Sequence, residues 1–212
     1  MTDESPVRSG LGEARSVLVL TDGLSPVRDT VCGALLARGP PERLHAMAVT
    51  YNRSASEWIA HAEAALGGKP RSVRIVDTGG SGDRDPVVVD AAPDDLTGLE
   101  IAISDPLPHD DGTTVFCFDS LTALLQYVDI DRAYRFLHAL VERLWAADAY
   151  AYFHMDPGAH DSQTVVTLTA LFDAVVATDP DAIPSGVDAT VVTDGEEVAL
   201  SRRPRFEPEG HA

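Results

Sequence analysis

The chain has 212 residues, and 44 % of them are hydrophobic, which suits a single domain with a sizeable core. Its 34 acidic residues outnumber its 16 basic residues, so its formal charge is -18. Such an acidic chain, with Lys69 as its one lysine, excludes non-specific binding to nucleic acid or to anionic lipid, because both need a basic patch.

The first half of the chain alternates short apolar runs with helical patterns. The run SVLVL is rich in β-branched and aliphatic residues, which is typical of a strand buried on both faces. Pro26 suits the first position of the following helix, and Ser54 with Glu57 has the pattern of a capping box. In chain order we expect a strand at 16–20, a helix at 26–37, a strand at 44–50, a helix at 54–66, a strand at 72–76 and an extended segment at 87–89.

The second half repeats this alternation and holds the clearest amphipathic helix. Apolar residues recur at helical spacing from Tyr134 to Leu144, and we expect Asp131 to cap that helix. We expect Asp161 to cap a later helix in the same way. In chain order the expected elements are a helix at 95–104, a strand at 114–118, helices at 120–128 and 131–148, a strand at 149–154, a helix at 161–171 and a strand at 173–178.

Strands that alternate with helices predict an α/β fold in three layers, with a mainly parallel sheet between two layers of helices. The last two extended runs, 189–193 and 197–201, are joined by Asp194-Gly195, which predicts an antiparallel hairpin at one edge of the sheet. We expect one domain over residues 15–203, with flexible segments at 1–14 and 204–212.

The chain is expected to be a soluble protein of a reducing cytoplasm. Cys32 and Cys117 lie in apolar stretches without CxxC spacing, which is typical of reduced cysteines. The first ten residues lack the apolar core of a signal peptide, and no stretch approaches the roughly 18 apolar residues of a membrane span. The acidic residues are spread along the chain, which favours adaptation to molar salt over a surface that is merely well solvated.

Asp119 is the leading candidate for a functional residue. It follows the apolar run VFCF and directly precedes a helical pattern. In an open parallel sheet, ligands bind beyond the carboxyl ends of the strands, where an aspartate can hold Mg²⁺ through water. The simpler alternative is that Asp119 caps the following helix, and the two roles are compatible.

The turn after the first strand, TDGLSPVRDT, is the place where a nucleotide-binding domain needs a phosphate loop that ends in Gly-Lys-Ser/Thr. This turn has one glycine and no lysine, so Gly23, Arg28 and Thr30 are the candidate phosphate contacts. Asp22 and Asp29 would repel a polyphosphate from the same turn. The sequence therefore disfavours phosphate binding.

A rival site lies between residues 154 and 161. His154, Asp156, His160 and Asp161 place two imidazoles and two carboxylates within eight residues, and such ligands suit zinc or manganese. Their spacing matches no established metal motif. The alternative is structural, because Asp161 is a good helix cap and Asp156-Pro157-Gly158 is a turn signal.

Four stretches resemble the KaiC-like branch of the RecA superfamily and, more narrowly, a haloarchaeal family of unknown function. They are VFCFDSLTALL, DRAYRFLHALVERLW, AYAYFHMDPGAHD and LFDAVV. The resemblance implies a RecA-like, P-loop NTPase-type fold, in which Asp119 is the counterpart of the magnesium-associated aspartate. The phosphate-loop lysine and threonine have no match in the turn. The stretch Tyr51-Asn52-Arg53 stands where such ATPases commonly carry a catalytic glutamate.

These observations lead to one principal hypothesis and two alternatives. The principal one is a RecA/KaiC-like domain that has lost ATP hydrolysis and acts as a regulatory or protein-interaction module, with a protein partner or a second copy of the chain. The first alternative keeps Mg-ATP as a ligand, bound by Gly23, Arg28, Thr30 and Asp119 in an atypical sensing site or ATPase. The second is a metal-dependent enzyme that uses the 154–161 loop.

Overall fold

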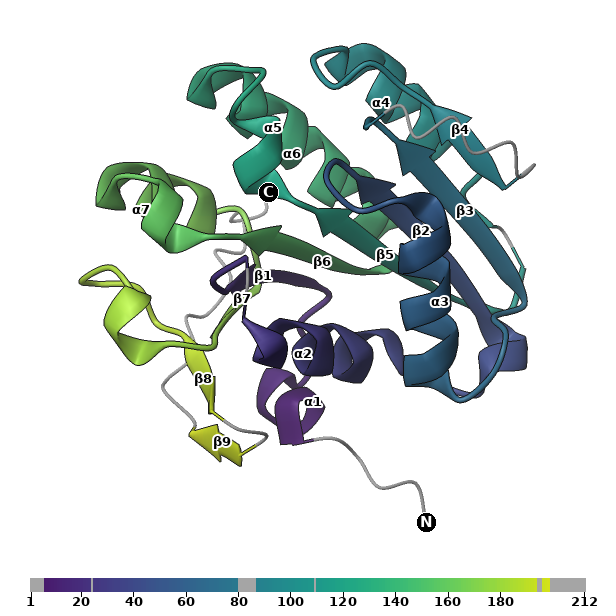
Figure 1. The fold of residues 1–212 in the computed structure, drawn as a ribbon, viewed down its shortest axis with the longest axis horizontal. Helices are drawn as coiled ribbons and strands as arrows, with labels where there is room; N and C mark the ends of the chain where they lie inside the picture. Colours follow the sequence, from purple (N-terminus) through teal and green to yellow (C-terminus); the bar gives the residue numbers. More distant parts are fainter. Residues whose placement is uncertain (1–5, 24, 80–86, 109, 194–195, 199–212) are drawn as a thin grey trace, which may run out of the picture.

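The computed structural model describes residues 6–23, 25–79, 87–108, 110–193 and 196–198 (Figure 1). Its strands are β1 (Ser16–Leu20), β2 (Leu44–Thr50), β3 (Ser72–Asp77), β4 (Val88–Asp90), β5 (Thr113–Asp119), β6 (Tyr150–Met155), β7 (Ala174–Ala177), β8 (Thr190–Thr193) and β9 (Glu196–Val198). Its α-helices are α1 (Pro6–Leu11), α2 (Pro26–Leu36), α3 (Ala55–Leu66), α4 (Leu96–Ser104), α5 (Leu121–Leu124), α6 (Ile130–Ala146) and α7 (Ser162–Thr169). Short 3-10 turns cover Pro41–Arg43, Pro157–Ala159 and Pro180–Ala182.

All nine strands form one sheet in the order β4-β3-β2-β5-β6-β1-β7-β8-β9. Strands β1 to β8 run parallel, so the expected α/β fold with a mainly parallel sheet is confirmed. Strand β9 pairs antiparallel with β8, with Val191 opposite Val198. The expected turn at Asp194-Gly195 lies outside the described residues, as do the residues after 198.

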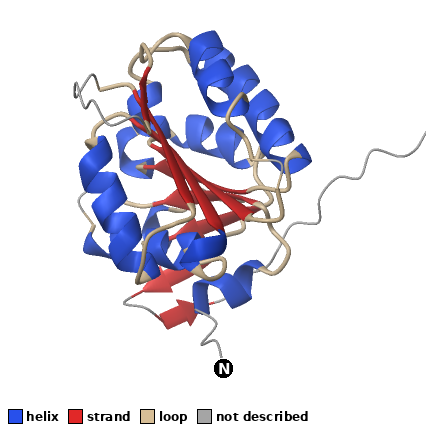
Figure 2. Ribbon diagram, turned by 90° about the vertical axis from the view of Figure 1, so that its right-hand side faces the viewer, coloured by secondary structure: helices blue, strands red, loops and turns tan. Residues whose placement is uncertain are grey.

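Helices cover both faces of this sheet (Figure 2). On one face, α1, α2 and α3 bury Val7, Val31 and Trp58 against one row of strand side chains. On the other face, α4, α6 and α7 bury their side chains against the second row. The two rows exist because successive side chains of a strand point to opposite faces, which is why every residue of β1 and β2 is buried.

Most helix boundaries follow from capping residues that the sequence displays. Ser54 and Glu57 form the expected capping box of α3, and the αL residue Gly67 ends that helix. One prediction is wrong: the side chain that caps α6 belongs to Asp129, which accepts a hydrogen bond from the Arg132 N–H at 2.9 Å. Asp131 lies in the first turn instead, since a cap must precede the helix and Ile130 already has helical geometry.

Two other expectations differ from the structure in detail. The helix expected at 120–128 is short, because α5 ends at Leu124 and Gln126 and Tyr127 donate to carbonyls three residues earlier. Residues 6–11, within the segment expected to be flexible, form α1, whose Val7 and Leu11 are buried. In the part of the chain that the structure describes, none of the helices is both long and apolar enough to cross a membrane.

Candidate functional site

A row of buried polar side chains crosses the carboxyl ends of four neighbouring strands. Thr50 of β2 lies between Asp77 of β3 and Asp119 of β5, and Asp119 lies beside His154 of β6. Each of the four is exposed by 7 % or less. Since their register places them at one level, all four point to the face that α2 and α3 cover. Burying so many polar groups is unfavourable unless they have partners, which marks this edge as a site.

A cleft of about 690 Å³ opens at the Asp119 and His154 end of this row. Its walls come from the turn after β1, the first turn of α2, the residues after β2 with α3, and the ends of β5 and β6. We call it the carboxyl-end cleft. Among the residues suggested by the sequence, Gly23, Arg28, Asp119, His154 and Asp156 line it. Thr30 does not line it and is exposed on α2.

Arg28 and Asp119 form an ion pair at the floor of the carboxyl-end cleft. The pair joins the start of α2 to the end of β5, and the two side chains are 16 % and 10 % exposed. Asp119 thus neutralises the charge of Arg28, which the sequence suggested as a phosphate contact. The hydroxyl of Ser120, the next residue, caps α5 by accepting from Ala123 N–H at 3.3 Å, so Asp119 is not the cap.

A second ion pair lies in the wall of the cleft that α2 and the segment after β2 form. Arg53, from the segment after β2, lies 3.0 Å from the Asp29 carboxylate on α2. Partial burial raises the pKa of Asp29, but the hydrogen bond and charge of Arg53 outweigh this and hold that pKa below its usual value. Both arginines of the cleft are therefore committed to carboxylates. An added Cβ at Gly23 would meet no described atom within 4 Å, so packing does not require a glycine there.

His154, which lines the cleft, contacts the thiol of Cys32 on α2. Cys32 Sγ lies 3.2 Å from His154 Nε2. Burial lowers the pKa of His154 to about 4, an effect that the Asp119 charge opposes, and burial raises the pKa of Cys32 to about 12. At neutral pH the thiol keeps its proton and the imidazole has no charge, so the pair is a poor nucleophile.

Unpartnered buried atoms gather at this cleft. Within the described ranges, His154 Nδ1, Arg28 Nε and His61 Nε2 are buried without a hydrogen-bond partner, and all three belong to lining residues. Thr50 Oγ1, in the polar row, is also buried without a hydrogen-bond partner among the described residues. Unsatisfied buried polar atoms are rare in folded proteins, so their concentration here indicates a place where water or a ligand supplies the missing bonds.

The buried His154 imidazole gives a pH dependence whose sign follows from its lowered pKa. Between the ordinary value of 6.5 and about 4, the unfolded chain binds a proton that the folded chain does not. The free energy of unfolding should therefore fall as the pH drops through this window. The total loss at the acid end of the window should be about 3 kcal/mol.

This prediction is checked by urea unfolding near pH 7 and near pH 4.5, in the wild type and in His154→Gln. The stability difference between the two pH values should shrink in the variant, because glutamine does not titrate. His138→Gln, at an exposed position on α6, is the matched control and should leave the difference unchanged. A pH response that is the same in wild type and His154→Gln would contradict the assignment.

The structure does not bring the four residues of the rival loop together. Asp156 accepts a hydrogen bond from Gly158 N–H at 2.9 Å, and Asp161 caps α7 by accepting from Thr164 N–H at 2.9 Å. His160 Nε2 lies 3.2 Å from Thr122 Oγ1, while His154 faces the opposite layer. Over residues 6–193 with their gaps and 196–198, no three His, Cys, Asp or Glu side chains are placed to hold a metal ion. These residues fit the structural alternative of caps and a turn.

The sequence did not single out Thr50, Asp77 or His61. A signal was present, because Thr50 and Asp77 end apolar strands just as Asp119 does. His154 was recognised but grouped with its sequence neighbours, although the sheet places it beside Asp119.

The comparison with known proteins adds one finding about the chain between β1 and β7. Residues 14–178, most of the chain, match the family of unknown function DUF7504. The chain belongs to this family. The matched part of this DUF7504 protein contains every strand and helix that lines the carboxyl-end cleft. No curated protein matches the chain. Membership of a family of unknown function is thus confirmed, while the relation to RecA and a source in halophilic archaea stay predictions.

Proposed function

We propose that this DUF7504 protein is a RecA/KaiC-like domain that has lost ATP hydrolysis and acts as a regulatory or protein-interaction module. The parallel sheet, with an aspartate at the end of a central strand, is compatible with a domain of that type. The charge of -18 favours a salt-rich cytoplasm as its setting. A second protein, or a second copy of the chain, is the partner of such a module.

The observation that carries this proposal is the ion pair between Arg28 and Asp119. Magnesium coordination by Asp119 and phosphate binding by Arg28 would each require this pair to open. Removing one partner from a buried pair costs about 3 kcal/mol, which corresponds to roughly a hundredfold loss of affinity. Asp22, Glu57 and Asp156 add further negative charge to the lining. The residues present therefore do not fit a magnesium-bound triphosphate.

The residues that line the cleft are also poorly suited to act as a general base for hydrolysis. Glu57 is a carboxylate of the lining, and it accepts hydrogen bonds from the Ser54 hydroxyl at 2.8 Å and the Ser54 N–H at 3.1 Å. These two hydrogen bonds lower the pKa of Glu57, which makes it a weaker proton acceptor. Arg53, in the stretch where the resemblance expects a glutamate, is paired with Asp29 and has no lone pair to accept a proton.

A nucleotide sensor without turnover is the second candidate function. The unpartnered polar atoms of His154, His61 and Arg28 favour it, because they show that the carboxyl-end cleft retains unused hydrogen-bonding capacity. Of the contacts that the sequence suggested for it, Thr30 lies outside the lining.

Isothermal titration of the full chain with Mg-ATP at molar KCl tests the proposal. We expect no binding tighter than millimolar and no release of phosphate, because both arginines in the described lining of the cleft are paired with carboxylates. Circular dichroism before and after each run checks that the chain is folded. Micromolar binding with phosphate release would overturn the proposal. Micromolar binding without release, lost in Asp119→Asn, would establish the sensor in its place.

A further inference from the structure

A serine, a histidine and an aspartate are joined by hydrogen bonds at the amino ends of β2, β3 and β5. Ser72 begins β3 and lies directly beside His45 of β2 in the register of the sheet. His45 Nδ1 lies 2.6 Å from Ser72 Oγ, and His45 Nε2 lies 2.8 Å from Asp110 Oδ1, in the loop before β5. We call these three residues the amino-end triad. All three lie outside the lining of the carboxyl-end cleft, so the function proposed above does not use them.

The loop before β5 holds the imidazole of His45 in a fixed orientation. Asp110 Oδ1 also accepts a hydrogen bond from Gly112 N–H at 2.8 Å, and Asp110 Oδ2 lies 3.1 Å from the Arg71 guanidinium. A Cβ added at Gly112 would overlap His45 Nε2, so the close approach of the loop to the ring requires a glycine there. The His45 side chain is 7 % exposed, which leaves the ring little freedom to turn.

These contacts determine which nitrogen of a neutral His45 ring carries the proton. The hydrogen bonds from Gly112 N–H and from His45 lower the pKa of Asp110, so its carboxylate is ionised at neutral pH. An ionised carboxylate only accepts hydrogen bonds, so His45 Nε2 carries the proton and donates it to Asp110. His45 Nδ1 then keeps its lone pair and accepts the hydrogen bond of the Ser72 hydroxyl. The ring is therefore placed as a general base for that hydroxyl.

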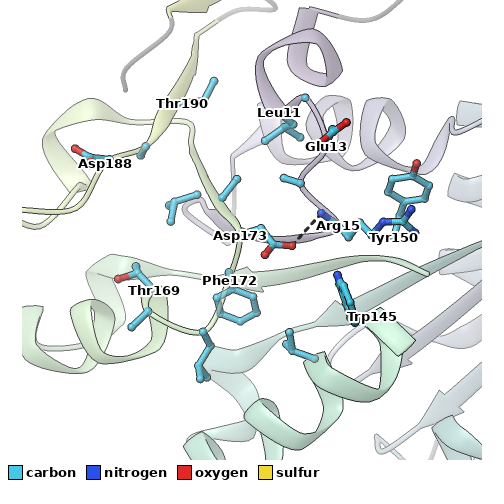
Figure 3. A pocket seen from close by; sticks show the side chains of 18 of the residues that line it. Leu11, Glu13, Arg15, Trp145, Tyr150, Thr169, Phe172, Asp173, Asp188 and Thr190 are labelled. Carbon is cyan, nitrogen blue, oxygen red and sulfur yellow. Dashed lines mark hydrogen bonds between the residues drawn. The ribbon is translucent and has the colours of Figure 1, made fainter. Parts of the chain in front are cut away.

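Ser72 is exposed, so a reactant in solution can reach its hydroxyl. A cavity of about 1140 Å³ opens at the same edge of the sheet, at the amino ends of β1, β6 and β7, but Ser72 does not line it (Figure 3). The charges beside the triad are balanced in ion pairs, because Arg43 lies 3.6 Å and Arg71 lies 3.5 Å from the carboxylate of Asp111. An open surface with balanced charges favours a small reactant without charge.

We propose that Ser72 is a nucleophile that takes the acyl group of a small uncharged ester. This activity is additional to the regulatory role proposed above and does not depend on it. Ser72 Oγ forms a bond to the ester carbonyl carbon while the hydroxyl proton moves to His45 Nδ1. The bond from that carbon to the leaving oxygen then breaks, and the proton passes from His45 to the alcohol that is released.

Water completes the reaction by the same path. Its oxygen forms a bond to the acyl carbon while His45 Nδ1 takes one of its protons, the bond from that carbon to Ser72 Oγ breaks, and His45 returns the proton to Ser72. The products are an alcohol and a carboxylic acid. Asp110 is a positioning residue, because it keeps the ring proton on Nε2 and stabilises the imidazolium that forms in each step.

The test treats the full chain with para-nitrophenyl acetate. Absorbance follows the nitrophenolate that is released, and mass spectrometry of peptides from the quenched protein locates the acetyl group. We expect the acetyl group on Ser72, and loss of this reaction in Ser72→Ala. Ser56→Ala is the matched control, because Ser56 is also exposed but its hydroxyl lies 3.3 Å from that of Ser54 rather than beside an imidazole. Acetylation of Ser72 that is no faster than that of Ser56 would overturn the proposal.

Variants of the other two residues test their roles, with circular dichroism to check that each variant is folded. His45→Gln should slow acetylation of Ser72 by at least about a hundredfold, the lower end of what a general base contributes. Asp110→Asn should slow it by a similar factor, and Asp110→Glu should restore much of the rate, because the exposed carboxylate has room for a longer side chain. Acetylation of Ser72 as fast in His45→Gln as in the wild type would contradict the proposal. A rate in Asp110→Glu as low as in Asp110→Asn would overturn the positioning role of Asp110.

Discussion

Replacing Arg28 with methionine is expected to lower the free energy of unfolding by about 3 kcal/mol, because Asp119 is then left as a buried carboxylate without its counter-ion. Both side chains of the pair are at most 16 % exposed, so water replaces the lost partner poorly. Chemical unfolding with urea, followed by circular dichroism, measures the change.

Two variants serve as controls for this prediction. Arg53→Met removes the cation of the neighbouring pair with Asp29, whose side chain is 52 % exposed, and should cost no more than about 1 kcal/mol. Arg28→Met combined with Asp119→Asn should recover much of the loss, because no buried charge then remains. If Arg28→Met is no more destabilising than Arg53→Met, the ion pair at the cleft floor does not have the importance assigned to it.

Replacing Phe118 with alanine is expected to destabilise the fold by about 4 kcal/mol, which is the range for truncating a buried phenylalanine. Phe118 is 0 % exposed and lies directly before Asp119 in β5. Its ring centroid is 5.8 Å from that of Tyr51, 5.9 Å from that of Phe153 and 6.3 Å from that of Phe136. The cavity left by the ring cannot collapse easily, because β5 is held by strands on both sides.

Thermal and urea unfolding measure this loss, which for a chain of this size corresponds to a melting temperature lower by about 10 °C. Tyr127→Ala is the matched control. Its ring also contacts Tyr51, at 6.2 Å between centroids, but it is 54 % exposed and should cost less than about 1 kcal/mol. A Phe118→Ala variant as stable as Tyr127→Ala would show that this aromatic cluster is not the centre of the core.

The positions of the strands along the chain could largely be predicted from the sequence. Apolar runs such as 16–20 and 44–50 are local patterns, and the structure places strands over the same residues. The capping box at Ser54 is likewise local, because its two partners lie three residues apart. Helix boundaries were harder to predict where two aspartates stand close together, as Asp129 and Asp131 do at the start of α6.

The candidate site could be predicted only in part from the sequence. Asp119 was found because it ends a buried strand, and Gly23 and Arg28 were found because they follow one. The pairing of Arg28 with Asp119 joins residues that are 91 positions apart, and the contact of Cys32 with His154 joins residues 122 apart. Neither contact leaves a pattern in the sequence, since both depend on which strands become neighbours.

The sequence by itself determined that this protein is an acidic α/β chain with a mainly parallel sheet and a carboxylate at the end of a central strand, because charge and hydrophobic periodicity are properties of the residues and their spacing. The tertiary structure alone decided that the arginine near the first turn is committed to that carboxylate, and that His154 belongs to the same floor rather than to the loop that follows it. Strand order and register decided both, since they bring distant side chains to one level on one face of the sheet.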